Sequence, residues 1–475
     1  MKSGQRRWIT VSSGLLAVVA IALVGPPAVF LAKTAWTDSP PGQFTLPAGV
    51  ADDVSHLNAV PVAEVWSIPA QRDAAESQLR DLLGRARETG RRVSIAGARH
   101  SMGGHTLYPD GIVVDMRPFR SVQVDGKQGL LTAGAGALWS EILPEVDAAG
   151  WSTGVMQSDS TFTVGGSLSV NCHGWAFGKP PIASTVESFR LMRADGSIVR
   201  CSREENRELF GLALGGYGLF GIILEAELRL VPNVRLRLDQ FGKPTPEGLV
   251  GLERLHTSSS PPSMVYARLN ITPDHRFESM RVNAYYPEPG QPIPDIQLPG
   301  ALGLRRAIFR GSANSDYGKK LRWLAETRLQ PSLLPDAISR NALLEGTPDW
   351  YLNRSTNATD ILHEYFVPRS ATVEFLRHAA AIITRHQGDL LNTTVRDVAE
   401  DSDTFLRYAR EPVTALVMFF NQARTPEAES RMEAMTRELI DAVLERGGCY
   451  YLPYRLHATP DQFHRAYPQA REFFR

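Results

Sequence analysis

The sequence predicts an α+β protein with two globular domains behind an apolar N-terminal segment. A length of 475 residues is enough for two or three separate hydrophobic cores. Short strand and helix patterns alternate up to a strand that ends at a proline near residue 232. Beyond it, strands alternate with longer helices, which is typical of an antiparallel sheet combined with helices. We therefore expect one domain over residues 61–233 and a second over residues 234–475.

The first residues have the composition of a membrane or export segment. An apolar run over residues 8–32 is long enough to cross a bilayer, and it follows the basic side chains Lys2, Arg6 and Arg7. Residues 1–35 are expected to be a membrane anchor. The alternatives are a cleaved export signal of the twin-arginine kind and an apolar stretch with neither role. An anchor or a signal would place the rest of the protein outside the cytoplasm, either tethered to the membrane or exported as a soluble protein.

Residues 36–60 contain Ser-Pro-Pro-Gly and few apolar positions, so they are expected to be a linker to the first domain. Apolar residues at helical spacing then predict a helix over residues 75–86, which Gly90 ends. The next apolar run predicts a buried strand over residues 92–96. The remaining elements expected in this domain are strands 111–115, 121–125 and 130–133, helix 138–149, hairpin arms 186–193 and 197–201, and strand 220–231.

The second domain is expected to have α+β structure with an antiparallel sheet. Its predicted strands cover residues 264–269, 364–367 and 415–420, and its predicted helices cover residues 371–385 and 426–446. The last helix has a complete set of boundary signals, because Thr425 is a good N-cap, Pro426 occupies the first helical position and Gly447-Gly448 follow the end.

Charge and cysteine content exclude several classes of protein. Lysine plus arginine and aspartate plus glutamate both number 51, so no overall field favours nucleic acid or an acidic partner. The three cysteines, Cys172, Cys201 and Cys449, are too few for a disulfide framework and too scattered for a zinc site. We therefore predict no nucleic-acid partner and no metal.

A glycine-rich segment follows the strand predicted at residues 92–96 and reads Gly97-Ala98-Arg99-His100-Ser101-Met102-Gly103-Gly104-His105. Its glycines can take positive φ and approach a ligand closely. Successive backbone N–H groups in such a turn form a concave site suited to a pyrophosphate. On its own, the segment fits a plain tight turn as well. The two histidines have no third ligand nearby, which argues against a metal.

Two further glycine segments follow. The first, Thr163-Val164-Gly165-Gly166-Ser167-Leu168-Ser169, combines β-prone residues with small hydroxyls that can donate hydrogen bonds to a flat ring, and His173-Gly174 follow it. The second, Gly216-Tyr217-Gly218-Leu219-Phe220-Gly221, matches the Gly-x-Gly-x-x-Gly fingerprint of nicotinamide-binding folds. That fingerprint requires a strand before the glycines and a helix after them. Here a predicted helix precedes and a β-rich run follows, so we exclude a Rossmann domain.

In their order and spacing, the three segments resemble the PCMH-type FAD-binding domain of the vanillyl-alcohol oxidase superfamily, which includes sugar-alcohol oxidases, aldonolactone oxidases and cytokinin dehydrogenases. The resemblance is strong over residues 60–235. It implies an FAD-binding domain of two subdomains, followed by an α+β substrate (cap) domain with an antiparallel sheet. The residues that it assigns to FAD binding are Gly97, Ala98, Arg99, His100, Ser101, Gly103, Gly104, His105, Thr163, Gly165, Gly166, Ser169, His173, Gly174, Gly218, Gly221 and Ile222.

The resemblance also implies that the flavin is bound covalently. In similar families the histidine of a Gly-x-x-His-Ser motif is joined to the flavin 8α carbon, and Gly97-Ala98-Arg99-His100-Ser101 matches that motif position for position. A neutral imidazole nitrogen is a competent nucleophile for this bond. The alternative is a loop histidine that only hydrogen-bonds over a non-covalent flavin.

Three residues are predicted to be catalytic. Sugar-alcohol oxidases have a Glu-x-Arg pair and a later lysine facing the flavin, and here Arg396 is kept, Thr394 replaces the glutamate and Tyr454 replaces the lysine. A lowered pKa would let Tyr454 accept an alcohol proton, and Arg396 would stabilise an alkoxide or a carboxylate. A core tyrosine and a surface arginine are the alternatives. Asp159 lies one residue from the catalytic aspartate of cytokinin dehydrogenases, with turn capping as its alternative. Two further candidates are Glu364 and His457.

The resemblance predicts an FAD-dependent oxidoreductase. Its substrate would be a small molecule with a sugar-alcohol or lactone-like CH–OH group, or next an amine, oxidised by hydride transfer to the flavin. Oxygen or another acceptor would then take the electrons. The alternatives are a membrane-associated flavin reductase or epimerase subunit that acts on a lipid-linked sugar, and a degenerate flavin-binding protein. Similar proteins continue with a segment that returns to the flavin domain, so the chain is expected to be truncated at Arg475 or to have lost this segment.

Overall fold

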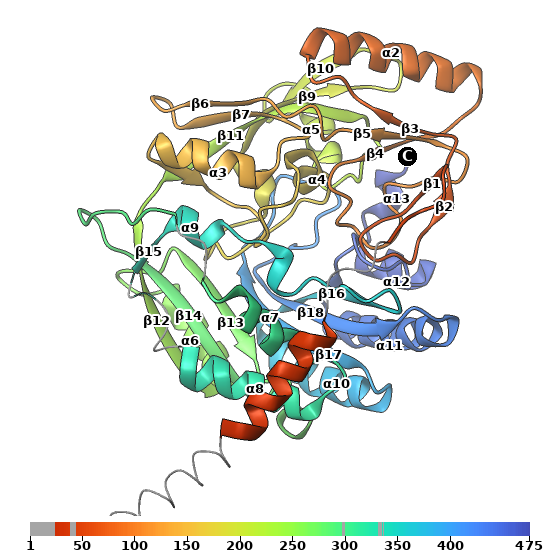
Figure 1. Cartoon of the computed structure of the whole chain (residues 1–475). Coiled ribbons are helices and arrows are strands. Elements are labelled where there is room, and N and C mark those ends of the chain that lie inside the picture. Colours follow the sequence, from red (N-terminus) through yellow and green to blue (C-terminus); the bar gives the residue numbers. More distant parts are fainter. Residues whose placement is uncertain (1–23, 39–43, 297–299, 331–334, 336) are drawn as a thin grey trace, which may run out of the picture.

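The computed structural model describes residues 24–38, 44–296, 300–330, 335 and 337–475. These residues form two lobes, each built around its own large hydrophobic core. The N-terminal lobe contains a small parallel sheet and a larger antiparallel sheet, and the C-terminal lobe contains one eight-stranded antiparallel sheet (Figure 1). Helices and mostly antiparallel strands together give the α+β architecture that the sequence predicts.

The first part of the N-terminal lobe is a three-stranded parallel sheet. Its order is β3 (Glu64–Ser67), β5 (Ile112–Asp115) and β4 (Val93–Ala96). The crossover helix α2 (Arg72–Glu88) buries one apolar stripe, which consists of Ala75, Leu79, Leu82, Leu83 and Ala86. These are the residues whose spacing predicts the helix. Because β4 ends at Ala96, the glycine-rich segment begins at the carboxyl edge of this sheet.

The second part of the N-terminal lobe is an antiparallel sheet in the order β10-β9-β11-β7-β6, with β8 paired to β11. Its strands are β6 (Val122–Asp125), β7 (Leu130–Gly134), β8 (Trp151–Thr153), β9 (Val186–Met192), β10 (Ile198–Ser202) and β11 (Ile222–Pro232). The helices that accompany it are α3 (Trp139–Ala148), α4 (Val164–Ser169) and α5 (Arg207–Ala213). The predicted hairpin is confirmed, because β9 and β10 pair antiparallel around a turn in which Gly196 has φ +85°.

The C-terminal lobe is built on the sheet β15-β12-β14-β13-β17-β18-β16-β19, in which every described pair is antiparallel. Its strands are β12 (Arg235–Pro244), β13 (Met264–Leu269), β14 (Ser279–Pro287), β15 (Ala337–Ser339), β16 (Ala358–Pro368), β17 (Asp389–Val398), β18 (Val413–Ala423) and β19 (Cys449–Tyr450). The helices of this lobe are α6 (Thr245–Leu255), α7 (Leu302–Arg310), α8 (Asp316–Leu324), α9 (Arg340–Leu344), α10 (Thr372–Arg385), α11 (Pro426–Leu444), α12 (Pro460–Ala466) and α13 (Ala470–Phe473).

The two faces of this large sheet have different neighbours. On β16, the His363 ring lies 3.4 Å from the hydroxyl of Thr436 on α11. The face of the sheet to which His363 points is therefore the one covered by helices. Because side chains alternate along a strand, Leu362 and Glu364 point to the other face, toward the N-terminal lobe. The start of α11 is as predicted, since the Thr425 side chain accepts a hydrogen bond from the backbone N–H of Ala428.

The segment before the first lobe is more ordered than the sequence suggests. A helix at residues 24–37 packs on the C-terminal lobe through Phe30, whose ring meets that of Tyr317 edge-on at 5.0 Å. No helix within the described ranges is long and apolar enough to cross a membrane. Residues 1–23 of the expected anchor lie outside the described residues.

Part of the expected linker belongs to the fold. β1 (Val50–Ala51) pairs with β2 (Val60–Pro61), and the intervening Asp52, Asp53 and Ser55 are buried. Hydrogen bonding adds to apolar burial here, since Ala51 also packs in a small hydrophobic cluster with Ala96 and Val113. Asp53 accepts hydrogen bonds from the N–H of Ser55 and from the distant N–H of Gly104. Polar side chains hold this segment, so a reading of apolar periodicity does not find it.

Candidate functional site

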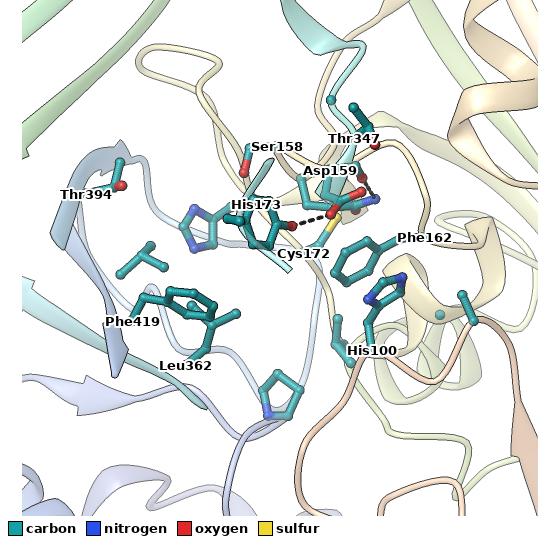
Figure 2. A pocket seen from close by; sticks show the side chains of 18 of the residues that line it. His100, Ser158, Asp159, Phe162, Cys172, His173, Thr347, Leu362, Thr394 and Phe419 are labelled. Atoms are coloured by element: carbon teal, nitrogen blue, oxygen red, sulfur yellow. Dashed lines mark hydrogen bonds between the residues drawn. The ribbon is translucent and has the colours of Figure 1, made fainter. Parts of the chain in front are cut away.

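A cavity of about 1310 Å³ lies between the two lobes. One wall comes from the glycine-rich segment, α4 and the turn before β11, and the other comes from the inner face of the large sheet. Figure 2 shows His100 and Phe162 on one side of the cavity, Thr394 and Phe419 on the other, and His173 between them. Ordinary ligand pockets measure roughly 300–1,000 Å³. This cavity therefore has room for a large cofactor together with a substrate.

The glycine-rich segment (residues 97–105) is anchored from two sides. The N–H of Gly104 donates to Asp53 at 2.8 Å, and the N–H of Met102 donates to the carbonyl of Pro453 at 2.9 Å. A Cβ on Gly103 would lie 2.4 Å from the carbonyl oxygen of Tyr454, so close packing requires glycine there. Gly103 and Gly104 thus serve the anchoring of the segment and do not line the cavity.

Polar groups of the same segment are free for a ligand. Among the described residues, Nε of Arg99, Oγ of Ser101 and Nδ1 of His105 are buried without a hydrogen-bond partner. The backbone N–H groups of residues 98–101 have no acceptor in the described part of the chain either. Donors gathered on a concave backbone suit the pyrophosphate of FAD, so the residues present fit this cofactor.

His100 is held with a defined orientation at the edge of the cavity. Its ring stacks on that of Phe162, with centroids 4.0 Å apart and an interplanar angle of 9°. The hydroxyl of Thr161 is 3.2 Å from Nε2. Burial lowers the pKa of His100, an effect that the Asp159 carboxylate opposes. The imidazole is therefore neutral at neutral pH.

The segment over residues 163–169 is helical, although its composition is β-prone. Thr163 caps α4 by accepting a hydrogen bond from Gly166 at 3.3 Å, and the N–H of Gly165 donates to the carbonyl of Ala135 at 2.8 Å. A Cβ on Gly165 would lie 2.8 Å from that of Ala135. The cap and this close approach to the chain after β7 outweigh the β propensity of the segment.

The third glycine segment turns between a helix and a strand. α5 precedes it and β11, which begins at Ile222, follows it. Gly218 has φ +78° and Gly221 has φ +145°, and both line the cavity. The order of elements is the reverse of a Rossmann turn, which confirms that the nicotinamide fingerprint is accidental here.

A buried polar cluster occupies the cavity where the two walls meet. Nε2 of His173 lies 2.5 Å from Oε1 of Glu364, and the hydroxyl of Tyr454 donates to Oε2 of Glu364 at 3.2 Å. Burial raises the pKa of Glu364, but His173, Arg396 and Tyr454 together lower it below the ordinary value. Glu364 is therefore ionised, and it is the acceptor at the centre of the cluster.

The structure corrects the expectation that Tyr454 has a lowered pKa. Burial raises the pKa of this phenol well above its ordinary value, and the carboxylate of Glu364 raises it further, against a smaller opposite effect of Arg396. Tyr454 is therefore a protonated donor to Glu364. The sequence reading did not foresee this because it placed a cation beside the phenol but no carboxylate.

Arg396 and Asp159 both line the cavity, and Ser158 contacts Arg396. Arg396 donates to the hydroxyl of Ser158 at 3.0 Å, and its Nε is buried without a partner among the described residues. Asp159 accepts hydrogen bonds from the N–H and hydroxyl of Thr161 and, at 2.5 Å, from the hydroxyl of Tyr351 (Figure 2). Both of its carboxylate oxygens are thus occupied.

The structure brings most of the predicted site residues to one cavity. Those that line it are Gly97, Ala98, Arg99, His100, Ser101, His105, Asp159, Thr163, Gly165, Gly166, Ser169, His173, Gly218, Gly221, Ile222, Arg396 and Tyr454. Gly174 does not line it. A Cβ on Gly174 would lie 1.9 Å from the carbonyl oxygen of Met156, so this glycine serves backbone packing.

Several cavity residues were not predicted from the sequence. Phe162 lies beside the second glycine segment, and its aromatic character next to that segment is a signal that could have found it. Tyr351 reaches Asp159 from a connection almost two hundred residues away, and no local pattern marks it. Glu364, a minor candidate from the sequence, is central because the register of β16 points it inward.

Comparison with known proteins supports the flavin site. Residues 74–202 match the family described as FAD binding domain. The chain is 29% identical to L-gulonolactone oxidase of Mus musculus over 177 residues, which are 37% of this chain and 40% of that protein. It is 35% identical to cytokinin dehydrogenase 1 of Arabidopsis thaliana over 144 residues, which are 30% of this chain and 25% of that protein.

A longer match is found with an uncharacterized oxidoreductase, ORF5 in the fasciation locus of Rhodococcoides fascians. It is 25% identical over 382 residues, 78% of this chain and 79% of that protein. The chain thus matches less than half the length of the gulonolactone oxidase and of the cytokinin dehydrogenase. Its N-terminal lobe contains an FAD binding domain, and the similarity to these oxidoreductases is consistent with the PCMH-type superfamily.

Proposed function

We propose that this protein oxidises a carbon that bears a hydroxyl group, with FAD as the immediate acceptor. The observation that carries the proposal is the contact between Tyr454 and the ionised Glu364 in a cavity large enough for FAD and a substrate. Oxidation of an alcohol releases a hydride and a proton. Bound FAD supplies the hydride acceptor, so the protein must take the proton.

Tyr454 and Glu364 are arranged to take this proton. The phenol oxygen accepts the substrate's hydroxyl proton while the phenol's own proton moves to Oε2 of Glu364, 3.2 Å away. The C–O single bond becomes C=O, and the negative charge of Glu364 is neutralised. His173, 2.5 Å from the other carboxylate oxygen, holds Glu364 in place. The relay therefore needs no phenol with a lowered pKa.

Arg396 and Asp159 have supporting roles in this proposal. The unpartnered Nε of Arg396 is available to the substrate oxygen, where its charge stabilises the developing alkoxide. Asp159, with both oxygens engaged by Thr161 and Tyr351, orients the residues around His100. A sugar-alcohol or lactone-like substrate fits the polar side chains on this wall, and oxygen or another acceptor completes the cycle.

The test is anaerobic reduction of the bound flavin by a panel of polyols, aldonolactones and amines. We expect at least one alcohol of the panel to bleach the visible flavin absorbance of the wild-type protein. In Glu364→Gln the rate of bleaching should fall by roughly 10²–10⁴-fold, because the final proton acceptor is lost while FAD stays bound. The matched control is Glu445→Gln, an exposed glutamate outside the cavity.

The pH dependence of the flavin reduction rate distinguishes a role of Glu364 as proton acceptor from a purely structural role. Because the pKa of Glu364 lies below its ordinary value of 4.5, the wild-type rate should persist as pH falls through that value and decline only below it. If the panel leaves the flavin oxidised, or if Glu364→Gln reduces it at the wild-type rate, the proposal fails.

A further inference from the structure

The inner face of the large sheet has a cationic part, away from the Glu364 cluster. Arg268 on β13 and Arg281 on β14 are direct cross-strand partners, and both line the cavity. Arg305 lines it from α7. The three arginines surround Tyr266: Arg268 lies 5.5 Å over its ring, and Arg281 and Arg305 are both its electrostatic neighbours.

These three arginines have no acidic partner. Within the described ranges no carboxylate lies within 4.0 Å of any of them. Arg268 donates to the hydroxyl of Thr394 at 2.8 Å, and Arg281 donates to the side chain of Gln240 at 3.1 Å. Nε of Arg281 is buried without any partner in the described part of the chain. Within the described residues, the hydrogen bonds of Arg268 and Arg281 go to neutral groups, including the carbonyl of Thr327, to which Arg281 donates at 3.4 Å.

Other buried arginines nearby do have carboxylate partners. Arg306 and Arg310, also on α7, pair with Asp38 and Asp360, and Arg322 pairs with Glu326 at 2.7 Å. Arg268, Arg281 and Arg305 have no such carboxylate among the described residues. Like charges directly opposite each other on neighbouring strands destabilise a sheet, and a half-buried charge without a counter-ion costs further free energy. An anionic ligand would remove both costs.

We propose that Arg268, Arg281 and Arg305 bind an oxyanion group of the substrate, a carboxylate or a phosphate. The inference rests on the proposed function and names its substrate class: an acidic or phosphorylated polyol. Strand β17 links the proposed anion site to the catalytic cluster. Thr394 on this strand contacts Arg268, and Arg396, two residues further along the same face, belongs to the catalytic cluster. Two residues along a strand span about 6.6 Å, which is about the length of the carbon chain of one small sugar.

The experiment compares three probes on the FAD-loaded protein: sorbitol, gluconate and sorbitol phosphate. Binding is measured by the upward shift in Tm, and KM and kcat by anaerobic flavin reduction. We expect at least one charged probe to bind about ten-fold or more tightly than sorbitol, since a charge-assisted contact has this magnitude. A preference for gluconate identifies a carboxylate substrate, and a preference for sorbitol phosphate identifies a phosphate ester.

Substitutions of the arginines test whether these residues cause the tighter binding of the charged probe. Arg268→Gln and Arg281→Gln should each raise the KM for the charged probe about ten-fold or more and leave kcat and the sorbitol KM nearly unchanged. Arg305→Gln, on a helix outside the sheet, gives the same readout if a strand variant fails to fold. Arg237→Gln is the matched control, because Arg237 is a half-exposed arginine of the same sheet outside the cavity.

The two proposals fail in different ways. If a charged probe shifts Tm in the wild type but not in the arginine variants, and neither these probes nor any member of the wider panel bleaches the flavin, the anion site stands and the alcohol oxidase proposal falls. If sorbitol reduces the flavin as well as the charged probes do, and the arginine variants match the wild type, the anion site is overturned. It is also overturned if the variants release FAD without changing the binding of either charged probe.

Discussion

His100 has one ring nitrogen engaged and an aromatic neighbour that fixes its plane. Thr161 contacts Nε2, and Phe162 stacks on the ring. Because burial keeps the imidazole neutral, one of its nitrogens retains a lone pair for bonding. A side chain oriented in this way in the wall of a flavin cavity is ready to form a covalent bond with little further loss of conformational entropy. We therefore propose a covalent histidyl flavin at this position.

The covalent bond is tested by acid precipitation. We expect the yellow colour of the wild-type protein to stay with the precipitated polypeptide, because a covalent flavin cannot dissociate on unfolding. His100→Ala should release all colour into the supernatant. His378→Ala is the control, since its exposed ring lies outside the cavity and its loss should leave the colour in the pellet. Release of the flavin from the wild-type protein would contradict the proposal.

The glycine segment over residues 97–105 owes its shape to a distant polar group. Asp53 accepts hydrogen bonds from the backbone of Gly104 and Ser55 and, at 2.7 Å, from the amide of Asn58. Asp53 is 3% exposed, so water cannot take the place of its carboxylate as the acceptor for these donors. The loop between β1 and β2 is thus a buried support for the wall that binds FAD.

Asp53→Ala is expected to loosen the glycine segment. Several buried donors lose their acceptor, so the free energy of unfolding should fall by about 1–3 kcal/mol or more. FAD retention should weaken as well, because the segment supplies its binding donors. Chemical denaturation and the ratio of bound flavin to protein measure the two effects. Asp81→Ala, an exposed helical aspartate, should change neither; equal behaviour of the two variants would contradict the supporting role.

Sequence patterns predicted the elements that are specified by residues close together in the sequence. The stripe from Ala75 to Ala86 specifies α2, and the signals around Thr425 specify the start of α11. The glycines that bind or pack near FAD were found because close approach leaves few other residues possible. Asp53 and Arg268 escaped because their roles depend on partners more than fifty residues away, and Glu364 was only a further candidate because its central position depends on strand register. Periodicity in one sequence contains neither kind of information.

The two lobes are connected through Arg455, a charged residue near the C-terminal end of the chain. Arg455, which follows Tyr454, donates to Asn58 at 2.5 Å and to the carbonyl of Met102 at 3.2 Å. Glu429 on α11 in turn accepts from Arg455, and it lies 2.8 Å from His457. One carboxylate on the outer helix layer therefore supports the segment that reaches the FAD-binding wall, and its ionisation should affect the stability of both lobes.

The pH dependence of stability tests this connection. Burial raises the pKa of Glu429, but His457, Gln422 and Arg455 lower it to about 2, from an ordinary value of 4.5. A carboxyl with a depressed pKa stabilises the folded state above its unfolded pKa and loses that effect as pH falls through the folded value. Glu429→Gln should thus have a lower Tm than the wild type at neutral pH, by a difference that stays constant down to about pH 4.5 and shrinks toward pH 2.

The reference for this measurement is Glu445→Gln, in which an exposed glutamate of α11's end is neutralised. Its Tm should follow that of the wild type at every pH. Following the flavin signal and the far-ultraviolet circular dichroism in the same scans distinguishes a local effect from a connection between lobes. If Glu429 supports the FAD-binding wall through Arg455, both signals shift together in Glu429→Gln. A shift in the circular dichroism alone would confine its role to the C-terminal lobe.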